Sequence, residues 1–596
     1  MKRIKLPIAF VAYFTLFLSA CQSDFLEQKT LVNIYEEDVF TDSLNTLGIV
    51  NSMYNDIGFS FSSKRFSNGG YDIGTNDAET LKDVSQWHYF FMKGAINPSN
   101  INKDPWTIPY EKIRIANLFL KNKDLIPVTK RTLDYWEAQV RFLRAWFIFQ
   151  QVKHYGGVPL IGDRIFTDQE EINLPRNTYA ECVQYIVDEC DAAAPNLPIE
   201  VDFNDVTYGG RVTRGAALAL KARVLLYAAS PLANCNRSDD PEHYVSFGEE
   251  NIERWKEAYD AAKVLMDPQF KYGLYKVDEP YFYNLFLQSY PTEENIFSEW
   301  PQNTTQNKML LETQSNPPSR GTRYAPSGPS SVFPTQHLVD AFPMLDGKSI
   351  EDKSGKYPYP GIGDDMYKNR DPRLAATVCY NGMPRPMEGF PNAVQWTYTG
   401  VVPAGDANVS SASKDGIYNS GATSTGYYRM KGMDKEIHSR GERYRPNILI
   451  RYAEILLNAA EAANEYESSP TQEIYEWLYQ IRDRAGIEKG DGPEFYGIKN
   501  NMTKEEMRDF IHNERRIELA FEEHRYWDIR RWRALEKEGM MNYWTQGLEI
   551  TRMADGTFEY RLIDVEERNN SEAQYWWPIP MSEITKSPAL VQNPGY

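Results

Sequence analysis

The sequence has few cysteines and histidines and lacks the common catalytic motifs. Of 596 residues, five are Cys and seven are His, and none of them follows the spacing of a zinc site. No Gly-x-Ser-x-Gly elbow, His-Glu-x-x-His helix, P-loop or EF-hand loop is found. The sequence therefore predicts no metal, no cofactor and no catalytic centre. A carboxylate pair for glycoside hydrolysis stays open as an alternative, because such a pair is defined by its separation in space.

Basic residues are also scarce. Lys and Arg number 65 against 83 Asp and Glu, which gives a formal net charge of −18. This balance disfavours a nucleic-acid partner, since nucleic acids are bound through basic patches. Aromatic residues are abundant instead, with 39 Tyr, 28 Phe and 13 Trp. Flat rings are used to stack on ligands, so this excess is the first indication of function.

No long hydrophobic run is present at the N-terminus. Residues 8–18 form an apolar run that follows three basic residues, and this run is too short to cross a hydrocarbon layer of roughly 30 Å. Residues 18–21, Leu-Ser-Ala-Cys, resemble a bacterial lipobox. We expect a lipoprotein signal peptide over residues 1–20, acylation of Cys21 and attachment to a membrane surface. The alternative is an ordinary secretory signal followed by a chance cysteine.

The remaining cysteines are expected to be buried free thiols. They are Cys182, Cys190, Cys235 and Cys379. Cys182 and Cys190 lie in a helical pattern, where eight residues correspond to a rise of roughly 12 Å, too far for a disulfide.

Apolar residues recur at helical spacing over both ends of the chain. Thr132–Tyr155 is apolar on most of its circumference, which predicts a helix buried in a helical layer. Further helices are predicted at Leu44–Ile57, Pro105–Asn122, Thr178–Ala194, Thr213–Ser230, Ile252–Met266, Ile448–Glu465, Ile474–Ala485 and Thr503–Glu536. Trp, Tyr and Ala at the crossing positions, as in residues 255–262, resemble tetratricopeptide packing, although no strict repeat is visible.

Two segments have a different composition. Residues from about 272 to 445 are rich in Gly, Pro, Ser, Asn and Tyr, with a strand-like run at 295–300, and residues 59–105 are similar. Long irregular loops in a globular protein are usually functional. The sequence thus predicts a mainly α protein, with a helical scaffold mainly at 40–270 and 445–540 that carries a large loop-rich insertion with short strands.

Residues 513–528 are the most distinctive run. Phe510, Ile517 and Phe521 mark one helix face, and charges of alternating sign recur every three residues from position 522 to position 531. A catalytic interpretation would make these residues acids and bases. We interpret the run as a core helix with a ladder of ion pairs.

This run resembles the hallmark helix of the SusD/RagB family, the surface lipoproteins of bacterial nutrient-uptake systems. Further segments resemble family motifs: VRFLRA (140–145) with YGGVPL (155–160), PTQHLVDAF (334–342) with DG (346–347), RYAEILLNAAEA (451–462), RDRAG (482–486), PIP (578–580) and QNPGY (592–596). Together with Cys21, the resemblance covers essentially the whole mature chain, which we treat as one SusD-like domain over residues 21–596. One departure is Glu523, which stands where the family commonly has Gly.

The resemblance implies a superhelix of four tetratricopeptide-like helix pairs and a glycan-binding lipoprotein without enzymatic activity. It would be anchored to the bacterial outer membrane, face the cell exterior and deliver glycan to a SusC-like TonB-dependent outer-membrane transporter. In such families the helical face docks the transporter, and loop aromatics hold the ligand. Two alternatives remain: peptide cargo, as in RagB-type relatives, and a surface glycoside hydrolase.

Eight loop residues are the candidates for contact with the ligand, through ring stacking or through hydrogen bonds to hydroxyl groups. They are Asn76, Asp77, Trp87, Tyr89, Trp300, Tyr324, Trp396 and Tyr398. For each ring, packing inside the protein is the alternative, because large aromatic side chains are mostly buried. Trp106 and Trp136 are expected in the core, since both lie on helix patterns.

Overall fold

The computed structural model describes most of the chain beyond residue 38. The described residues are 39–58, 70–80, 90, 92–167, 169–205, 209–300, 311, 315–319, 332–386, 391–401, 412–419, 421–435 and 445–596. Among them, no helix combines the length and the apolar character that a membrane span requires.

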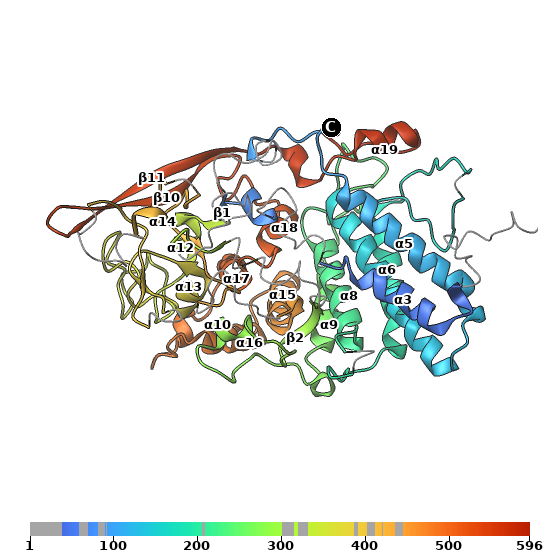
Figure 1. Cartoon of the computed structure of the whole chain (residues 1–596), viewed down its shortest axis with the longest axis horizontal. Coiled ribbons are helices and arrows are strands. Elements are labelled where there is room, and N and C mark those ends of the chain that lie inside the picture. Colours follow the sequence, from blue (N-terminus) through green and yellow to red (C-terminus); the bar gives the residue numbers. More distant parts are fainter. Residues whose placement is uncertain are drawn as a thin grey trace, which may run out of the picture.

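Helices dominate the described part of the chain up to residue 264 (Figure 1). They are α3 (Ser43–Tyr54), α5 (Asp104–Asn122), α6 (Lys130–Tyr155), α7 (Tyr179–Ala193), α8 (Arg214–Ala229) and α9 (Glu253–Val264). From α5 onward each helix packs against the next, and α9 packs against α15 (Tyr452–Tyr466). This succession of neighbouring helices confirms the predicted mainly α, tetratricopeptide-like scaffold. The side chains of Trp106 and Trp136 are buried in its core, as expected.

The helices have clear start signals. Thr178 caps α7 and Thr503 caps α17 (Lys504–Glu518), each in a reciprocal capping box with a Glu three residues later. α16 (Gln472–Ala485) ends at Gly486, which adopts a left-handed conformation with a φ of 85°. These local signals explain why most predicted helix limits agree with the structure to within one or two residues.

Two predicted helices differ from the structure. The predicted Ile448–Glu465 helix begins as strand β9 (Asn447–Arg451), which pairs antiparallel with β2 (Asn295–Glu299). The predicted Thr503–Glu536 helix is divided into α17 and α18 (His524–Arg531). Between them, Phe521 and Glu523 have φ values of 59° and 69°, a conformation that breaks a helix and that non-glycine residues rarely adopt.

The loop-rich part lies on the other side of α15–α18 from the first helices (Figure 1). Its short helices are α10 (Tyr281–Leu285), α12 (Gln336–Ala341), α13 (Pro372–Thr377) and α14 (Ala412–Asp415). Its two-residue strands pair as β1 (Ala78–Glu79) with β3 (Phe333–Pro334), β4 (Val378–Cys379) with β8 (Tyr428–Arg429), and β5 (Met383–Pro384) with β6 (Val394–Gln395).

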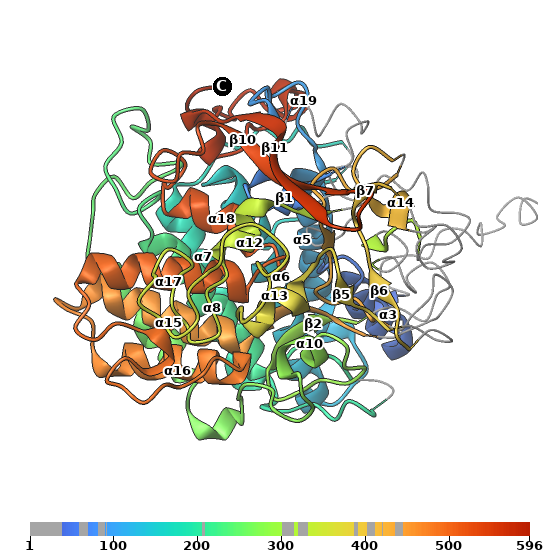
Figure 2. The ribbon, with the colours of Figure 1, turned by 90° about the vertical axis from the view of Figure 1, so that its left-hand side faces the viewer.

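A long hairpin near the C-terminus was not predicted. Strand β10 (Asn542–Arg552) pairs antiparallel with β11 (Phe558–Asn569) and parallel with β7 (Thr399–Gly400). Figure 2 shows this hairpin lying across the loop-rich part. Beyond it, the short helix α19 (Met581–Lys586) lies near the C-terminus. The turn contains Asp555-Gly556, with a φ of 90° at Gly556, and Asp-Gly between strand-like runs is a hairpin signal.

Among the described residues, buried hydrophobic side chains form a large core between the helices, a second core below the hairpin and several smaller clusters. The second core includes Phe342, Tyr427, Leu548 and Ile550. Of the four cysteines that the structure describes, Cys182, Cys190 and Cys379 are buried free thiols, as expected, whereas Cys235 is only partly buried.

Candidate functional site

The distinctive run of residues 513–528 lies in a network of buried charges. Arg373 of α13 donates to Glu514 Oε1 at 2.6 Å and to Glu518 Oε2 at 2.9 Å, and Arg451 donates to Glu518 Oε1 at 2.7 Å. The side chains of Arg373, Glu514 and Glu518 are fully buried. Arg451 also pairs with Glu522 at 2.7 Å. The network therefore joins helices to the loop-rich part and differs from a ladder along one helix.

These carboxyl groups do not suit acid catalysis. The guanidinium groups of Arg484, Arg451 and Arg373 outweigh the effect of burial and hold the pKa of Glu518 well below its usual range. A general acid in glycoside hydrolysis needs a raised pKa so that it is protonated at neutral pH. The geometry supports the structural interpretation of this run.

Asn76 and Asp77 connect the segment 70–80 to α17 and α18. Asp77 is 3% exposed, and its carboxylate accepts from Arg516 Nε at 2.8 Å and lies 3.7 Å from Arg525 Nε. The side-chain oxygen of Asn76 accepts from Arg525 Nη2 at 3.3 Å. The structure therefore gives Asp77 an internal partner, whereas Asn76 keeps a partly exposed surface.

Trp396 and Tyr398 lie beneath the hairpin. The Trp396 ring stacks on Phe558, with 5.9 Å between ring centroids, and Tyr398 packs 5.4 Å from the same ring. Tyr398 is 2% exposed, so its ring packs in the second core, contrary to the expectation that it would meet a ligand. Trp396 remains partly exposed.

Trp300 directly follows β2 and belongs to a cluster of rings. Its ring centroid lies 4.3 Å from that of Phe203, which in turn lies 5.5 Å from that of Tyr290. Tyr290 is 63% exposed, and Phe203 and Trp300 are partly exposed. We call Phe203, Tyr290 and Trp300 the ring cluster. Of these three rings, the sequence predicts only Trp300 as a ligand contact. The one local signal for Phe203 is its place between the short polar residues of Asp-Phe-Asn-Asp (202–205).

The other predicted residues lie outside the described part of the chain. They are Cys21, Trp87, Tyr89 and Tyr324. Within the described ranges, no group of three or more His, Cys, Asp or Glu is arranged to hold a metal ion.

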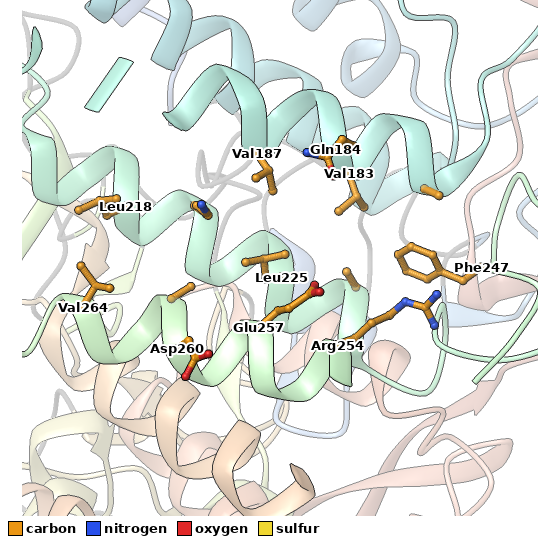
Figure 3. A pocket seen from close by; sticks show the side chains of 14 residues that line it. Val183, Gln184, Val187, Leu218, Leu225, Phe247, Arg254, Glu257, Asp260 and Val264 are labelled. Carbon is orange, nitrogen blue, oxygen red and sulfur yellow. The ribbon is translucent and has the colours of Figure 1, made fainter. Parts of the chain in front are cut away.

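A groove of about 580 Å³ lies between α7, α8 and α9. Figure 3 shows the apolar side chains that line it: Val183 and Val187 from α7, Leu218 and Leu225 from α8, and Val264 from α9. Charged side chains of α9, among them Arg254, Glu257 and Asp260, also line it. None of the predicted ligand residues that the structure describes lines this groove, which belongs to the helical scaffold.

Two family models match the chain. The model described as the SusD family matches residues 293–596, and a model described as starch-binding and associating with the outer membrane matches residues 24–226. SusD-like protein P38 of Formosa agariphila is 23% identical over the full length of both chains. SusD-like protein P2 of the same organism is 33% identical over 172 residues, a match that spans 28% of this chain and 29% of that protein.

Solved structures share the fold along nearly the whole chain. A SusD-like protein from Bacteroides fragilis has a TM-score of 0.74 at 24% identity, with 94% of this chain and 99% of that chain covered. A laminarin-binding SusD-like protein has a TM-score of 0.61 at 19% identity, with 93% and 100% covered. Since a family model matches the second half of the sequence and the fold agrees with SusD-like structures throughout, this chain belongs to the SusD family.

Proposed function

We propose that this protein is a cell-surface glycan-binding lipoprotein that captures oligosaccharides or polysaccharides and delivers them to a SusC-like TonB-dependent outer-membrane transporter. The observation that carries the proposal is the family match to both parts of the chain, at residues 24–226 and 293–596. A solved relative is named as laminarin-binding. We extend glycan binding to the present chain. The proposal includes that the protein binds the glycan without hydrolysing it.

The chemistry of the described surface supports a sugar ligand. A pyranose ring presents a face of C–H groups that stacks on Trp or Tyr, and its hydroxyl groups need short polar partners. Partly exposed rings occur at Trp300 and Trp396, and Asn76 offers a partly exposed amide. Together with Trp87, Tyr89 and Tyr324, these residues form the proposed binding set.

The proposed attachment follows from the N-terminal sequence. Acylation of Cys21 would hold the protein at the outer leaflet of the outer membrane, because each buried CH₂ of an acyl chain contributes about 0.8 kcal/mol. The helical face would dock the transporter, and the loop-rich part would face the ligand. This division agrees with the separation of the two parts in Figure 1.

The binding role is tested by affinity electrophoresis of the protein lacking residues 1–21. Native gels contain laminarin, starch, xylan, pectin or alginate, and a Trp87→Ala variant runs alongside. We expect retardation by at least one polysaccharide and weaker retardation of the variant. If no polysaccharide retards the protein and the protein binds peptides, the cargo is peptide instead.

Two further measurements test the other parts of the proposal. Incubation of pure protein with each polysaccharide should release no reducing ends, and release would establish a hydrolase. The full-length protein, purified from its native outer membrane, should carry a TonB-dependent barrel protein identified by mass spectrometry. Conversion of Cys21 to Ala should move the protein out of the membrane fraction.

A further inference from the structure

The ring cluster brings together three segments that are far apart in the sequence. Phe203 lies in the loop between α7 and α8, Tyr290 follows α10, and Trp300 follows β2. Phe203 is the central ring: its plane is tilted by 48° from that of Trp300 and lies nearly perpendicular to that of Tyr290, at 84°. The cluster therefore presents rings in different orientations rather than one flat stack.

The exposure of this cluster is unusual for packing alone. Tyr290 is 63% exposed although it contacts Phe203. Leaving an aromatic ring in water forgoes the free energy of burial, about 25 cal/mol for each Å² of apolar surface. Grouped exposed rings with polar neighbours are typical of binding surfaces.

The backbone of Gly210 and buried ion pairs of Glu294 hold the ring cluster in place. Gly210 has a φ of 75°, and a Cβ at this position would lie 2.6 Å from Cδ1 of Trp300. The ring of Trp300 therefore rests on the backbone of Gly210, and only glycine permits that approach. Glu294, which directly precedes β2, accepts from Arg484 Nη1 at 2.6 Å and from Arg451 Nη1 at 2.8 Å. The strand that leads to Trp300 is thus fixed at its start by buried charges.

Among the described residues next to Phe203, the polar groups are a carboxylate and an amide. Asp202 and Asn204 flank Phe203 and are exposed. The adjacent cation, Arg211, already donates to Asn51 and lies over another ring, 4.8 Å from the centroid of Tyr54. Carboxylate and amide groups both form hydrogen bonds with hydroxyl groups, and the negative charge of Asp202 repels an anionic sugar.

We propose that Phe203, Tyr290 and Trp300 form a stacking surface for a neutral sugar unit, with Asp202 and Asn204 bonding its hydroxyl groups. This inference rests on the proposed function and adds to it a specific subsite and a preference for uncharged glycan. Phe203 and Tyr290 contribute their ring faces, and Trp300, at the strand end, contacts and orients Phe203.

The test uses isothermal titration calorimetry of the protein lacking residues 1–21 with laminarin, xylan and starch as neutral probes and alginate and pectin as acidic probes. Tyr290→Ala should weaken binding of a neutral glycan about tenfold, which corresponds to 1.4 kcal/mol. Tyr290→Phe keeps the ring and should bind within about twofold of the parent, a difference of roughly 0.4 kcal/mol. Because Tyr290 is largely exposed, neither change disturbs the core.

Tyr418→Ala is the matched control, since Tyr418 is 75% exposed and lies beside Glu549 and Arg561 of the hairpin instead of the ring cluster. Its affinity should equal that of the parent. If the parent binds a neutral glycan and Tyr290→Ala binds it equally well, the subsite is overturned while the proposed function stands. If the parent prefers alginate or pectin, the neutral-sugar preference is wrong. Absence of binding to all probes would overturn the proposed function and this inference together.

Discussion

Replacement of Glu523 by Gly should destabilise the protein even though it relieves backbone strain. Glu523 has a φ of 69°, and the left-handed conformation costs a non-glycine residue about 1–2 kcal/mol. Its side chain, however, accepts from Lys153 Nζ at 3.1 Å and from Trp527 Nε1 at 3.2 Å. The side chains of Lys153 and Glu523 are both 6% exposed.

The two effects oppose each other, and the ion pair should be the larger. Removing one partner of a buried pair costs about 3–5 kcal/mol, because the other charge is left without a partner. Subtracting the relief of strain, we expect Glu523→Gly to lower the free energy of unfolding by about 1–4 kcal/mol. The family resemblance, in which Gly is common at this position, makes the result informative about why Glu stands here.

Guanidinium denaturation of the protein lacking residues 1–21, combined with a double-mutant cycle, measures the effect. Lys153→Met with Glu523→Gly removes both charges and should recover most of the loss.

Burial lowers the pKa of Lys153, whereas Glu523 raises it. Without Glu523 the folded-state pKa of Lys153 falls further below its unfolded value, so the unfolded state binds more protons and stability rises with pH. The deficit of the single variant should therefore be smaller at pH 9 than at pH 7. A single variant as stable as the parent would refute this reasoning.

Three further variants test other parts of the structure. Burial raises the pKa of Asp72 from 3.8 to about 7, so the folded state binds more protons between these values and stability falls as pH rises through them. Asp72→Asn should remove this dependence and raise the unfolding free energy at pH 8 by up to about 4 kcal/mol in denaturation curves. Arg484→Met leaves Glu294 and Glu518 short of a partner and should lower the unfolding free energy by about 3–5 kcal/mol, and an unchanged midpoint would argue against the network. Gly210→Ala should weaken binding of neutral glycan in calorimetry, because its Cβ would displace Trp300, and unaltered affinity would separate Gly210 from the ring cluster.

The helical scaffold could be predicted because its signals are local. Periodic apolar residues and capping residues such as Thr178 and Thr503 specify where α7 and α17 begin. The break after α17 was missed because Phe521 and Glu523 carry the left-handed conformation that Gly would have signalled. Strand β9 was missed because the apolar residues 448–450 fit a helix and a strand equally well. Their pairing with β2, which is far away in the sequence, decides their conformation.

The proposed ligand surface was less predictable, since exposure is a property of the folded chain. Tyr398 and Trp396 are two positions apart in the sequence, yet one is buried below the hairpin and the other is partly exposed. Phe203 and Tyr290 are far apart in the sequence, with α8 and α9 between them. Nothing in the sequence of either segment indicates that the two rings come into contact. Residue type therefore suggested stacking, and only the fold distinguished rings that pack from rings that face outward.

The buried charges explain how irregular loops can hold a defined surface. Arg373 of α13 is anchored to α17, and Arg451 and Arg484 are anchored to Glu294, which directly precedes β2. Guanidinium groups form directional bonds, so each pair fixes orientation as well as distance. Rings carried beyond these anchors, such as Trp300, can then be positioned without regular secondary structure around them. It follows that changes in the network should reduce stability and binding together, whereas changes at Tyr290 should alter binding alone.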